Sequence, residues 1–168
     1  NLPFVTFRST FHNAGNEPLV LNHVPTVSAA VDLGKPLSGI STLGTGGLLE
    51  PDKNPGSYAF LSMADPQTRS GVVGGWLTHD RGSGVVFSPV KDGTVRIQAQ
   101  IDYGRLRIKP GAEAEGEWFA LGYFDDARFG LEAYAEAVGK IYDVQLLPQT
   151  SSLCTWYLDR QARLLRLE

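Results

Sequence analysis

The sequence predicts a mainly β protein, an antiparallel β-sandwich with one helix near its C-terminus. From Phe4 to Tyr123, short runs of β-branched and aromatic residues are separated by Gly, Pro, Asn and Asp, the pattern of strands joined by hairpin turns. After Tyr123 the apolar residues adopt helical spacing. The chain has 168 residues, of which 42% are apolar, enough to bury one core.

The first third of the chain predicts a strand pair followed by a long loop. Strands are expected at residues 4–11 and 19–24, with a third at 27–33, because turn residues fill the gap at 13–18. Residues 34–57 hold many Gly and Pro residues and almost no periodicity, which predicts a surface loop. The run Gly44-Thr45-Gly46-Gly47 lacks the lysine of a phosphate-binding loop, so a plain loop is the preferred interpretation.

The middle of the chain predicts a series of antiparallel strands. Turn residues at 64–66, 80–84, 91–93 and 109–111 divide strands expected at 58–63, 70–78, 84–88, 94–102, 105–108 and 114–123. Alternation is regular in 94–102, which predicts that one face of this strand is buried and the other is exposed to water. The residues expected to be buried are Val95, Ile97, Ala99 and Ile101.

A helix is predicted over residues 127–142. Asp125 and Asp126 precede it as capping residues, Lys140 lies near its C-terminal end, and Pro148 prevents its continuation. The residues 153–157 after that proline are apolar and aromatic, which predicts a single buried strand. The helix is expected to pack on the sheet through Leu131, Tyr134, Val138, Ile141 and Tyr142.

Charge and composition argue against several functional classes. The formal charge of −3 with interspersed signs predicts neither nucleic acid nor an anionic membrane as partner. His12, His23 and His79 lack the spacing of zinc ligands, so no metal and no cofactor is expected. The lone Cys154 lies in an apolar run and is interpreted as a buried thiol. No signal peptide or run of about 18 apolar residues is present, and the sequence leaves a cytoplasmic or secreted location open.

A family resemblance rests on the run GYFDDARFGLEAYAEAVGKIYDV, the proline-bearing linker and CTWY, together with RSGVVGGWLTHDRGSGVVFS and IDYGRLRIKPG. These segments, within residues 57–157, resemble the domain boundary of α-galactosidase-like proteins of glycoside hydrolase family 36. The resemblance implies an N-terminal β-supersandwich, here residues 1–147, joined through the helix to a catalytic TIM barrel. Residues 148–168 would then be a linker and the start of that barrel, which needs about 250 residues in full.

The resemblance implies a non-catalytic sandwich domain of a retaining glycoside hydrolase. Its expected role is to support the barrel and shape the entrance for a galactoside or another carbohydrate. The family's two catalytic aspartates fall on later barrel strands, so no catalytic residue is assigned here. The alternative is a self-standing carbohydrate-binding or structural sandwich. Without barrel neighbours, residues 153–157 are expected to be mobile or to mediate homo-oligomers.

Aromatic residues that can stack on a sugar ring are the remaining candidates. Tyr58, Trp76 and Trp118 lie in predicted strands, where most aromatic residues belong to the core. Trp156 ranks higher, because the resemblance places it towards the C-terminal end of the first barrel strand. The substrate-binding residues predicted are Trp156, Trp76, and the turn residues His79 and Asp80.

Overall fold

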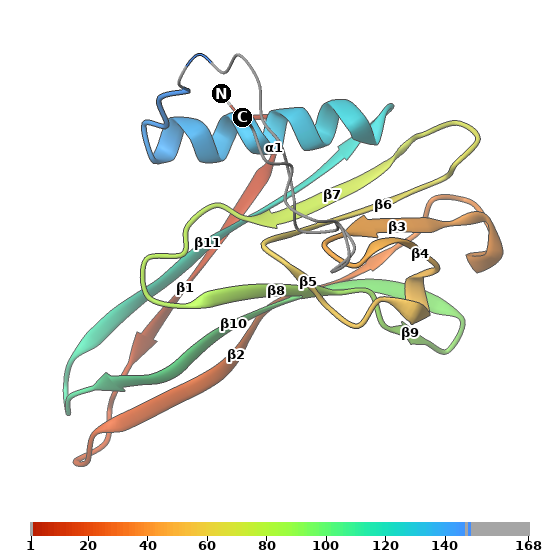
Figure 1. Ribbon diagram of the computed structural model, residues 1–168. Coiled ribbons are helices and arrows are strands. Elements are labelled where there is room, and N and C mark those ends of the chain that lie inside the picture. Colours follow the sequence, from red (N-terminus) through yellow and green to blue (C-terminus); the bar gives the residue numbers. More distant parts are fainter. Residues whose placement is uncertain (1, 147, 149–168) are drawn as a thin grey trace, which may run out of the picture.

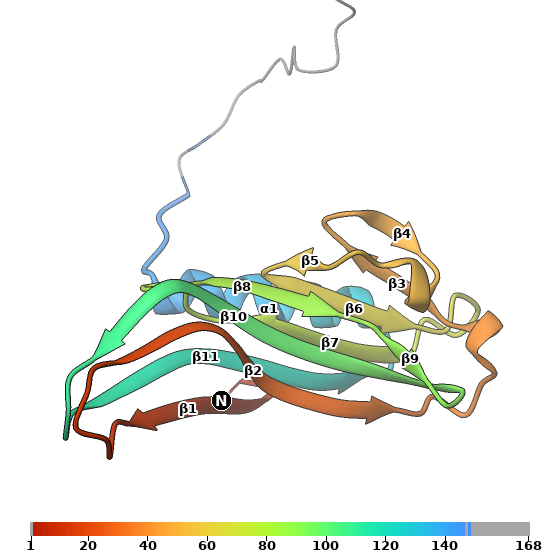
Figure 2. The same ribbon diagram turned by 90° about the horizontal axis from the view of Figure 1, so that it is seen from below.

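The strands form two antiparallel sheets packed face to face, and helix α1 (Ala127–Ile141) covers the outer face of the larger sheet (Figure 1). The computed structural model describes residues 2–146 and 148. Seen from below, the smaller sheet faces the viewer and α1 lies behind the sandwich (Figure 2). The predicted antiparallel β-sandwich with a C-terminal helix is therefore confirmed. The predicted strand at 153–157 lies outside the described residues.

Strand order brings the two ends of the described chain together in one sheet. The six-stranded sheet has the order β1-β11-β7-β6-β3-β4, so the first strand pairs with the last. The five-stranded sheet has the order β2-β10-β8-β5, with β9 paired to β10. The strands of the larger sheet are β1 (Val5–His12), β3 (Ser41–Gly44), β4 (Gly47–Leu49), β6 (Phe60–Ala64), β7 (Gly71–Trp76) and β11 (Glu113–Phe124). Those of the smaller sheet are β2 (Leu19–Val31), β5 (Ser57–Tyr58), β8 (Ser83–Phe87), β9 (Val90–Lys91) and β10 (Thr94–Ile108).

The longest strands are continuous where the sequence predicted breaks. The two strands expected at 94–102 and 105–108 form the single β10, and those at 19–24 and 27–33 form β2. Shifts in register take the place of the expected breaks, between Asp102 and Leu106 in β10, and between Ala99 and Gln100 where β10 faces the middle of β2. The predicted alternation in β10 is confirmed, since Val95, Ile97, Ala99 and Ile101 are at most 1% exposed.

Residues 34–57 are more ordered than the sequence predicted. They contain the β3–β4 hairpin and the short 3-10 helices Leu37–Gly39 and Pro51–Lys53. The expectation of a plain loop is wrong here, because β3 pairs with β6 and so gains partners distant in sequence. Strands this short carry too few residues for periodicity to reveal them.

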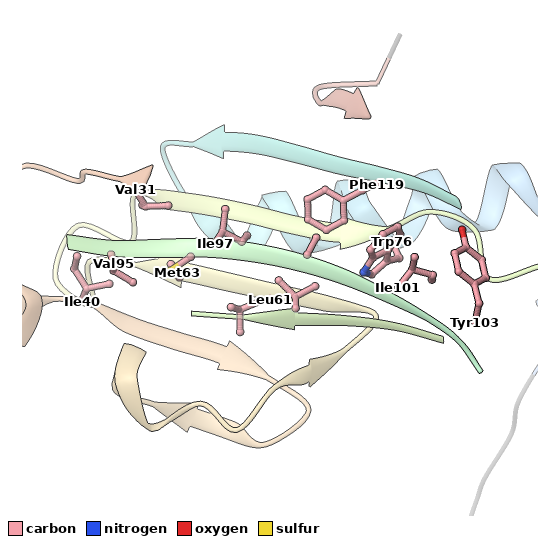
Figure 3. Close-up of a cluster of buried hydrophobic side chains, with 12 residues drawn as sticks. Val31, Ile40, Leu61, Met63, Trp76, Val95, Ile97, Ile101, Tyr103 and Phe119 are labelled. Carbon is pink, nitrogen blue, oxygen red and sulfur yellow. The ribbon is translucent and has the colours of Figure 1, made fainter. Parts of the chain in front are cut away.

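Large side chains fill the space between the two sheets. Trp76 and Phe119 have no exposed surface, and their rings meet edge to face with centroids 5.3 Å apart (Figure 3). The Trp76 ring lies against Gly84 of the opposite sheet, where an added Cβ would come within 2.2 Å of Cδ1. Such interdigitation is the packing expected of a sandwich core.

Helix α1 (Ala127–Ile141) packs on β7, β11 and β6 through small residues and one tyrosine. Its buried residues are Ala127, Gly130, Tyr134 and Ala137. The Tyr134 hydroxyl donates a hydrogen bond to the Trp76 carbonyl oxygen at 2.7 Å, and burial raises the pKa of Tyr134 to about 12.

The predicted face of the helix was correct for only part of its length. Tyr134 is buried, and Leu131 and Val138 pack partly buried against the same cluster. Ile141 and Tyr142 are each 44% exposed, so the expectation that they dock on the sheet is wrong. The contact face is rotated towards small residues, which allow the helix to approach the sheet closely.

Candidate functional site

A groove opens on the outer face of the six-stranded sheet, beside the C-terminal end of α1. It has a volume of about 370 Å³ and collects side chains from the N-terminal segment, β1, β11, the loop after β7, and α1. Its lining mixes apolar surface with hydroxyl, carboxylate and guanidinium groups. The lining residues are Leu2, Thr6, Arg8, Leu77, Thr78, Asp80, Trp118 and Ile141.

The register between β1 and β11 places Arg8 beside Trp118. These residues are direct partners across the two strands, and alternation turns Trp118 outward while Phe119 enters the core. The Arg8 guanidinium lies over the indole, 5.2 Å from its centroid. Arg8 is itself held by the Glu115 carboxylate at 2.8 Å and donates from Nε to the Gly116 carbonyl oxygen at 2.9 Å. Trp118 is thus oriented from one side and remains 37% exposed.

A buried carboxylate anchors the loop that follows β7. Glu117 is 2% exposed and accepts hydrogen bonds from the Thr78 hydroxyl and, at 3.0 Å, from the Arg81 backbone N–H. The Thr78 oxygen in turn accepts from the Trp118 backbone N–H at 3.0 Å. A buried carboxylate that lost these donors would carry a large desolvation penalty, so the loop is strongly held. Asp80 lies between the two anchored positions.

The end of α1 closes the site from the other side. The Tyr142 hydroxyl donates to Asp80 Oδ1 at 3.2 Å and accepts from the His79 backbone N–H at 2.8 Å. Burial raises the pKa of Tyr142, the His79 N–H opposes that shift, and the Asp80 carboxylate adds to it. The phenol therefore stays protonated at neutral pH and continues to donate to Asp80.

The predicted substrate-binding residues fall in three different places. Asp80 lines the groove, and His79 lies next to it with its Nδ1 accepting a 3.4 Å hydrogen bond from the Gly84 N–H. Trp76 is fully buried between the sheets (Figure 3), so it belongs to the core and the expectation that it contacts carbohydrate is wrong. Trp156 lies outside the described residues.

The other aromatic candidates are both on the surface. Tyr58 is 66% exposed in β5 of the smaller sheet, whereas Trp118 lies in the groove. The sequence did not predict that Arg8, Leu2 and Ile141 belong to the site. The strand alternation in 114–123 could have shown that Trp118 and Phe119 face opposite ways, but the partner of Trp118 depends on a pairing between distant strands.

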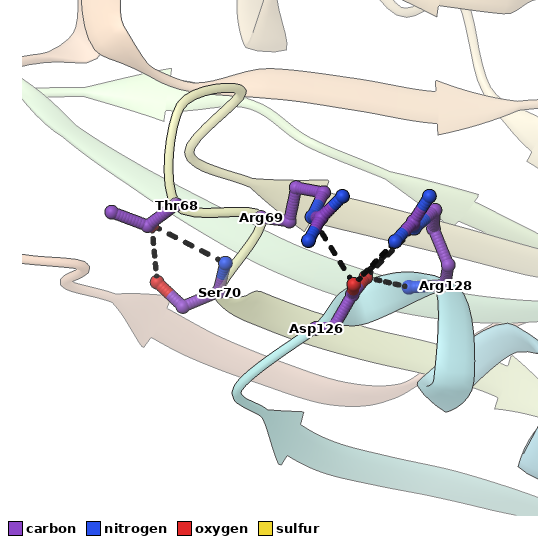
Figure 4. A network of polar contacts seen from close by, with 5 residues as sticks. All are labelled: Thr68, Arg69, Ser70, Asp126 and Arg128. Carbon is purple, nitrogen blue, oxygen red and sulfur yellow. Dashed lines mark hydrogen bonds and ion pairs between the residues drawn. The ribbon is translucent and has the colours of Figure 1, made fainter.

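The two adjacent aspartates before α1 have different roles. Asp126 caps the helix by accepting from the Arg128 N–H at 3.1 Å, and its carboxylate also pairs with the Arg128 and Arg69 side chains (Figure 4). Hydrogen bonds from the Arg128 side chain, with its charge and that of Arg69, lower the pKa of Asp126 to about 2. Asp125 is exposed and takes no part in the cap, so the capping prediction is confirmed for Asp126 only. A carboxylate with so low a pKa is unsuited to act as a general acid at neutral pH.

The described residues contain neither a cluster of metal ligands nor a helix that could span a membrane. No three His, Cys, Asp or Glu residues among them are grouped as a metal site. Their one α-helix is too short and too polar to cross a membrane. In comparisons with known proteins, no protein-family model and no curated protein sequence matched the chain.

Proposed function

We propose that this chain is the non-catalytic N-terminal sandwich domain of an α-galactosidase-like glycoside hydrolase. In this role it supports a catalytic barrel that follows α1 and shapes the sugar entrance. The observation that carries the proposal is a patch of exposed apolar side chains where the chain leaves the helix. We call it the exit patch: Leu2, Trp118, Ile141, Tyr142, Val144 and Leu146.

The exit patch combines the end of the helix with the groove. Ile141 and Tyr142 are each 44% exposed, Val144 is 52% exposed and Leu146 is 91% exposed. Leu2 and Trp118, each 37% exposed, line the groove together with Ile141. Three of the six residues line one groove and the other three follow Ile141 along the chain, and clusters of exposed apolar side chains mark interaction surfaces. A domain that begins just after Pro148 would be tethered next to this patch at high effective concentration.

The fold and the position of the groove support the same proposal. An antiparallel sandwich followed by one docked helix is the arrangement that the family resemblance implies. The groove adjoins the chain exit through Ile141, and Tyr142 binds the Asp80 loop. A barrel tethered at this point would have the groove beside it, which is the position expected of a surface that shapes a substrate entrance.

A self-standing carbohydrate-binding module is the second candidate. The exposed Trp118 beside Asp80 in a groove favours it, since an aromatic plane next to polar groups is typical of sugar sites. This candidate does not require the helix end to contact another domain. Whether the exit patch contacts another domain therefore distinguishes the two candidate functions.

The reading frame of the gene beyond Glu168 provides the first test, and we expect it to encode a barrel with two suitably spaced aspartates. The chain and that barrel, produced as one protein, should hydrolyse aryl α-galactosides, whereas the chain alone should not. In the joined protein, amides 141–146 should exchange more slowly than in the chain alone.

Surface variants test the contact itself. Ile141→Ser and Leu146→Ser should lower the thermal midpoint of the joined protein and leave that of the chain alone almost unchanged. Val20→Ser is the matched control, because Val20 is 46% exposed on β2, away from the exit patch. A gene that ends at Glu168 would reject the barrel proposal in favour of the self-standing module. The barrel proposal would also be contradicted if Val20→Ser and Leu146→Ser lowered the thermal midpoint of the joined protein equally.

A further inference from the structure

We infer that the groove is a binding site for a single neutral pyranose unit. This assignment rests on the proposed function, in which the groove lies at the sugar entrance, and it names the ligand that the groove binds there. Small-molecule pockets range from about 300 to 1,000 Å³. At about 370 Å³ the groove lies at the lower end of this range, which suits one ring rather than several.

One wall of the groove offers an apolar surface for the C–H face of a sugar. The Trp118 indole is 37% exposed there, with Leu2 and Ile141 beside it. Arg8 packs over the indole and is tied to Glu115 and to the Gly116 carbonyl oxygen, so the ring is oriented before a ligand arrives. A wall ordered in advance reduces the entropy lost on binding.

Polar groups at fixed positions also line the groove. Tyr142 holds Asp80 through Oδ1, and Oδ2 has no partner among the described residues, so it is available to accept from a sugar hydroxyl. Thr6 adds an exposed hydroxyl that both donates and accepts. Arg8 lines the groove and uses Nε and Nη2 for its protein contacts, which leaves Nη1 without a partner among the described residues. Pyranose recognition requires such a combination of an apolar plane and convergent polar groups.

The charges in the groove favour a neutral ligand. The positive charge of Arg8 is offset by Glu115 at 2.8 Å. Asp80 remains at the groove, and the carboxylate of Glu117 is buried behind Thr78. An acidic sugar would bring its carboxylate towards like charges, so a uronic acid should bind less well than the corresponding neutral hexose.

The test is a titration of the full 168-residue chain with methyl α-D-galactopyranoside and, separately, methyl α-D-glucopyranoside, followed through the indole N–H signals in NMR spectra. The Trp118 signal, assigned with Trp118→Phe, should shift with a dissociation constant of about 1 to 10 mM for at least one sugar. The buried Trp76 signal should stay in place. Galacturonate and glucuronate should bind at least about fivefold more weakly.

Variants locate the site. Trp118→Ala should weaken binding about tenfold, and Asp80→Asn about fivefold or more, with circular dichroism confirming that each variant is folded. Tyr58→Ala removes an aromatic residue of the other sheet that is even more exposed, 66% against 37% for Trp118, and should leave the affinity unchanged. No shift at 100 mM of either sugar, or binding that survives Trp118→Ala, would overturn the assignment. Uronates binding as tightly as neutral sugars would overturn the neutral ligand class. These results do not depend on a barrel, so they stand apart from the test of the exit patch.

Discussion

The two faces of the six-stranded sheet are packed by different means. The face towards the smaller sheet carries large side chains such as Trp76 and Phe119, which interlock with residues of β10 and β8. The face towards the helix carries Val73, Gly75 and Ala120, with Ala127 and Ala137 of α1 against them. The inner face is packed with large buried side chains, whereas the small residues of the outer face allow the helix to approach the sheet closely.

Two adjacent glycines in β7 show the difference directly. An added Cβ on Gly74 would meet Ile97 at 2.5 Å in the inner core, while one on Gly75 would meet the Tyr134 ring at 2.4 Å on the helix side. Successive residues of a strand point to opposite faces. Gly74 therefore makes room for the inner core and Gly75 makes room for the helix, so substitutions at the two positions perturb the two layers separately.

The largest expected effect is on the inner face. Trp76→Ala removes a fully buried indole and should lower the free energy of unfolding by about 3 to 5 kcal/mol. Urea denaturation followed by circular dichroism measures this loss. A loss below about 1 kcal/mol would mean that the inner core does not depend on this side chain.

The helix layer should respond to overpacking rather than to cavities. Gly75→Ala places a methyl group against the Tyr134 ring, which its hydrogen bond to the Trp76 carbonyl oxygen holds in place, and should cost about 1 to 3 kcal/mol. Gly139→Ala is the matched control within α1. Nothing lies within 4 Å of an added Cβ there, so the variant should stabilise the protein by about 0.5 to 1 kcal/mol. Thermal unfolding should shift the two midpoints in opposite directions, and a common direction would contradict the close-approach model.

Truncations along the helix compare its docked and undocked ends. Leu131→Ala should cost about 1 to 2 kcal/mol, because Leu131 packs partly buried against the helix-side cluster. Ile141→Ala should change stability by less than about 0.5 kcal/mol, since Ile141 is 44% exposed. Chemical denaturation of the two variants distinguishes them. An Ile141 cost equal to that of Leu131 would show that the helix docks along its whole length.

The smallest expected effect is the pH dependence of the helix start. The pKa of Asp126 is about 2 in the folded protein, below its ordinary 3.8, so its charge stabilises the fold above pH 3.8 and loses this effect as the pH falls towards 2. Asn still caps a helix, but Asp126→Asn removes the charge that pairs with Arg69 and Arg128. The thermal midpoint of the variant should therefore fall less steeply than that of the wild type between pH 4 and pH 2. Asp125→Asn removes the same charge from the exposed neighbour and should follow the wild-type curve.

Features governed by neighbouring residues could be predicted from the sequence. The buried face of β10 follows from alternation, and the start of α1 at Ala127 follows from the capping residue Asp126. The turn at Asp92 and Gly93, both with positive φ, follows from local turn chemistry. Each depends on interactions within a few residues, which the order of amino acids specifies directly.

Tertiary structure decided which surfaces meet. Leu131, Tyr134, Val138 and Ile141 share a helical face, yet the buried contact includes Gly130 and Ala137, because a sheet face bearing Gly75 admits a closer approach along small residues. The β3–β4 hairpin exists because β6 pairs with it. The groove arises in the same way, since Arg8 and Trp118 become neighbours only when the first and last strands pair. Local spacing sets the periodicity of an element, but the choice of partner depends on the packing of segments far apart in the chain.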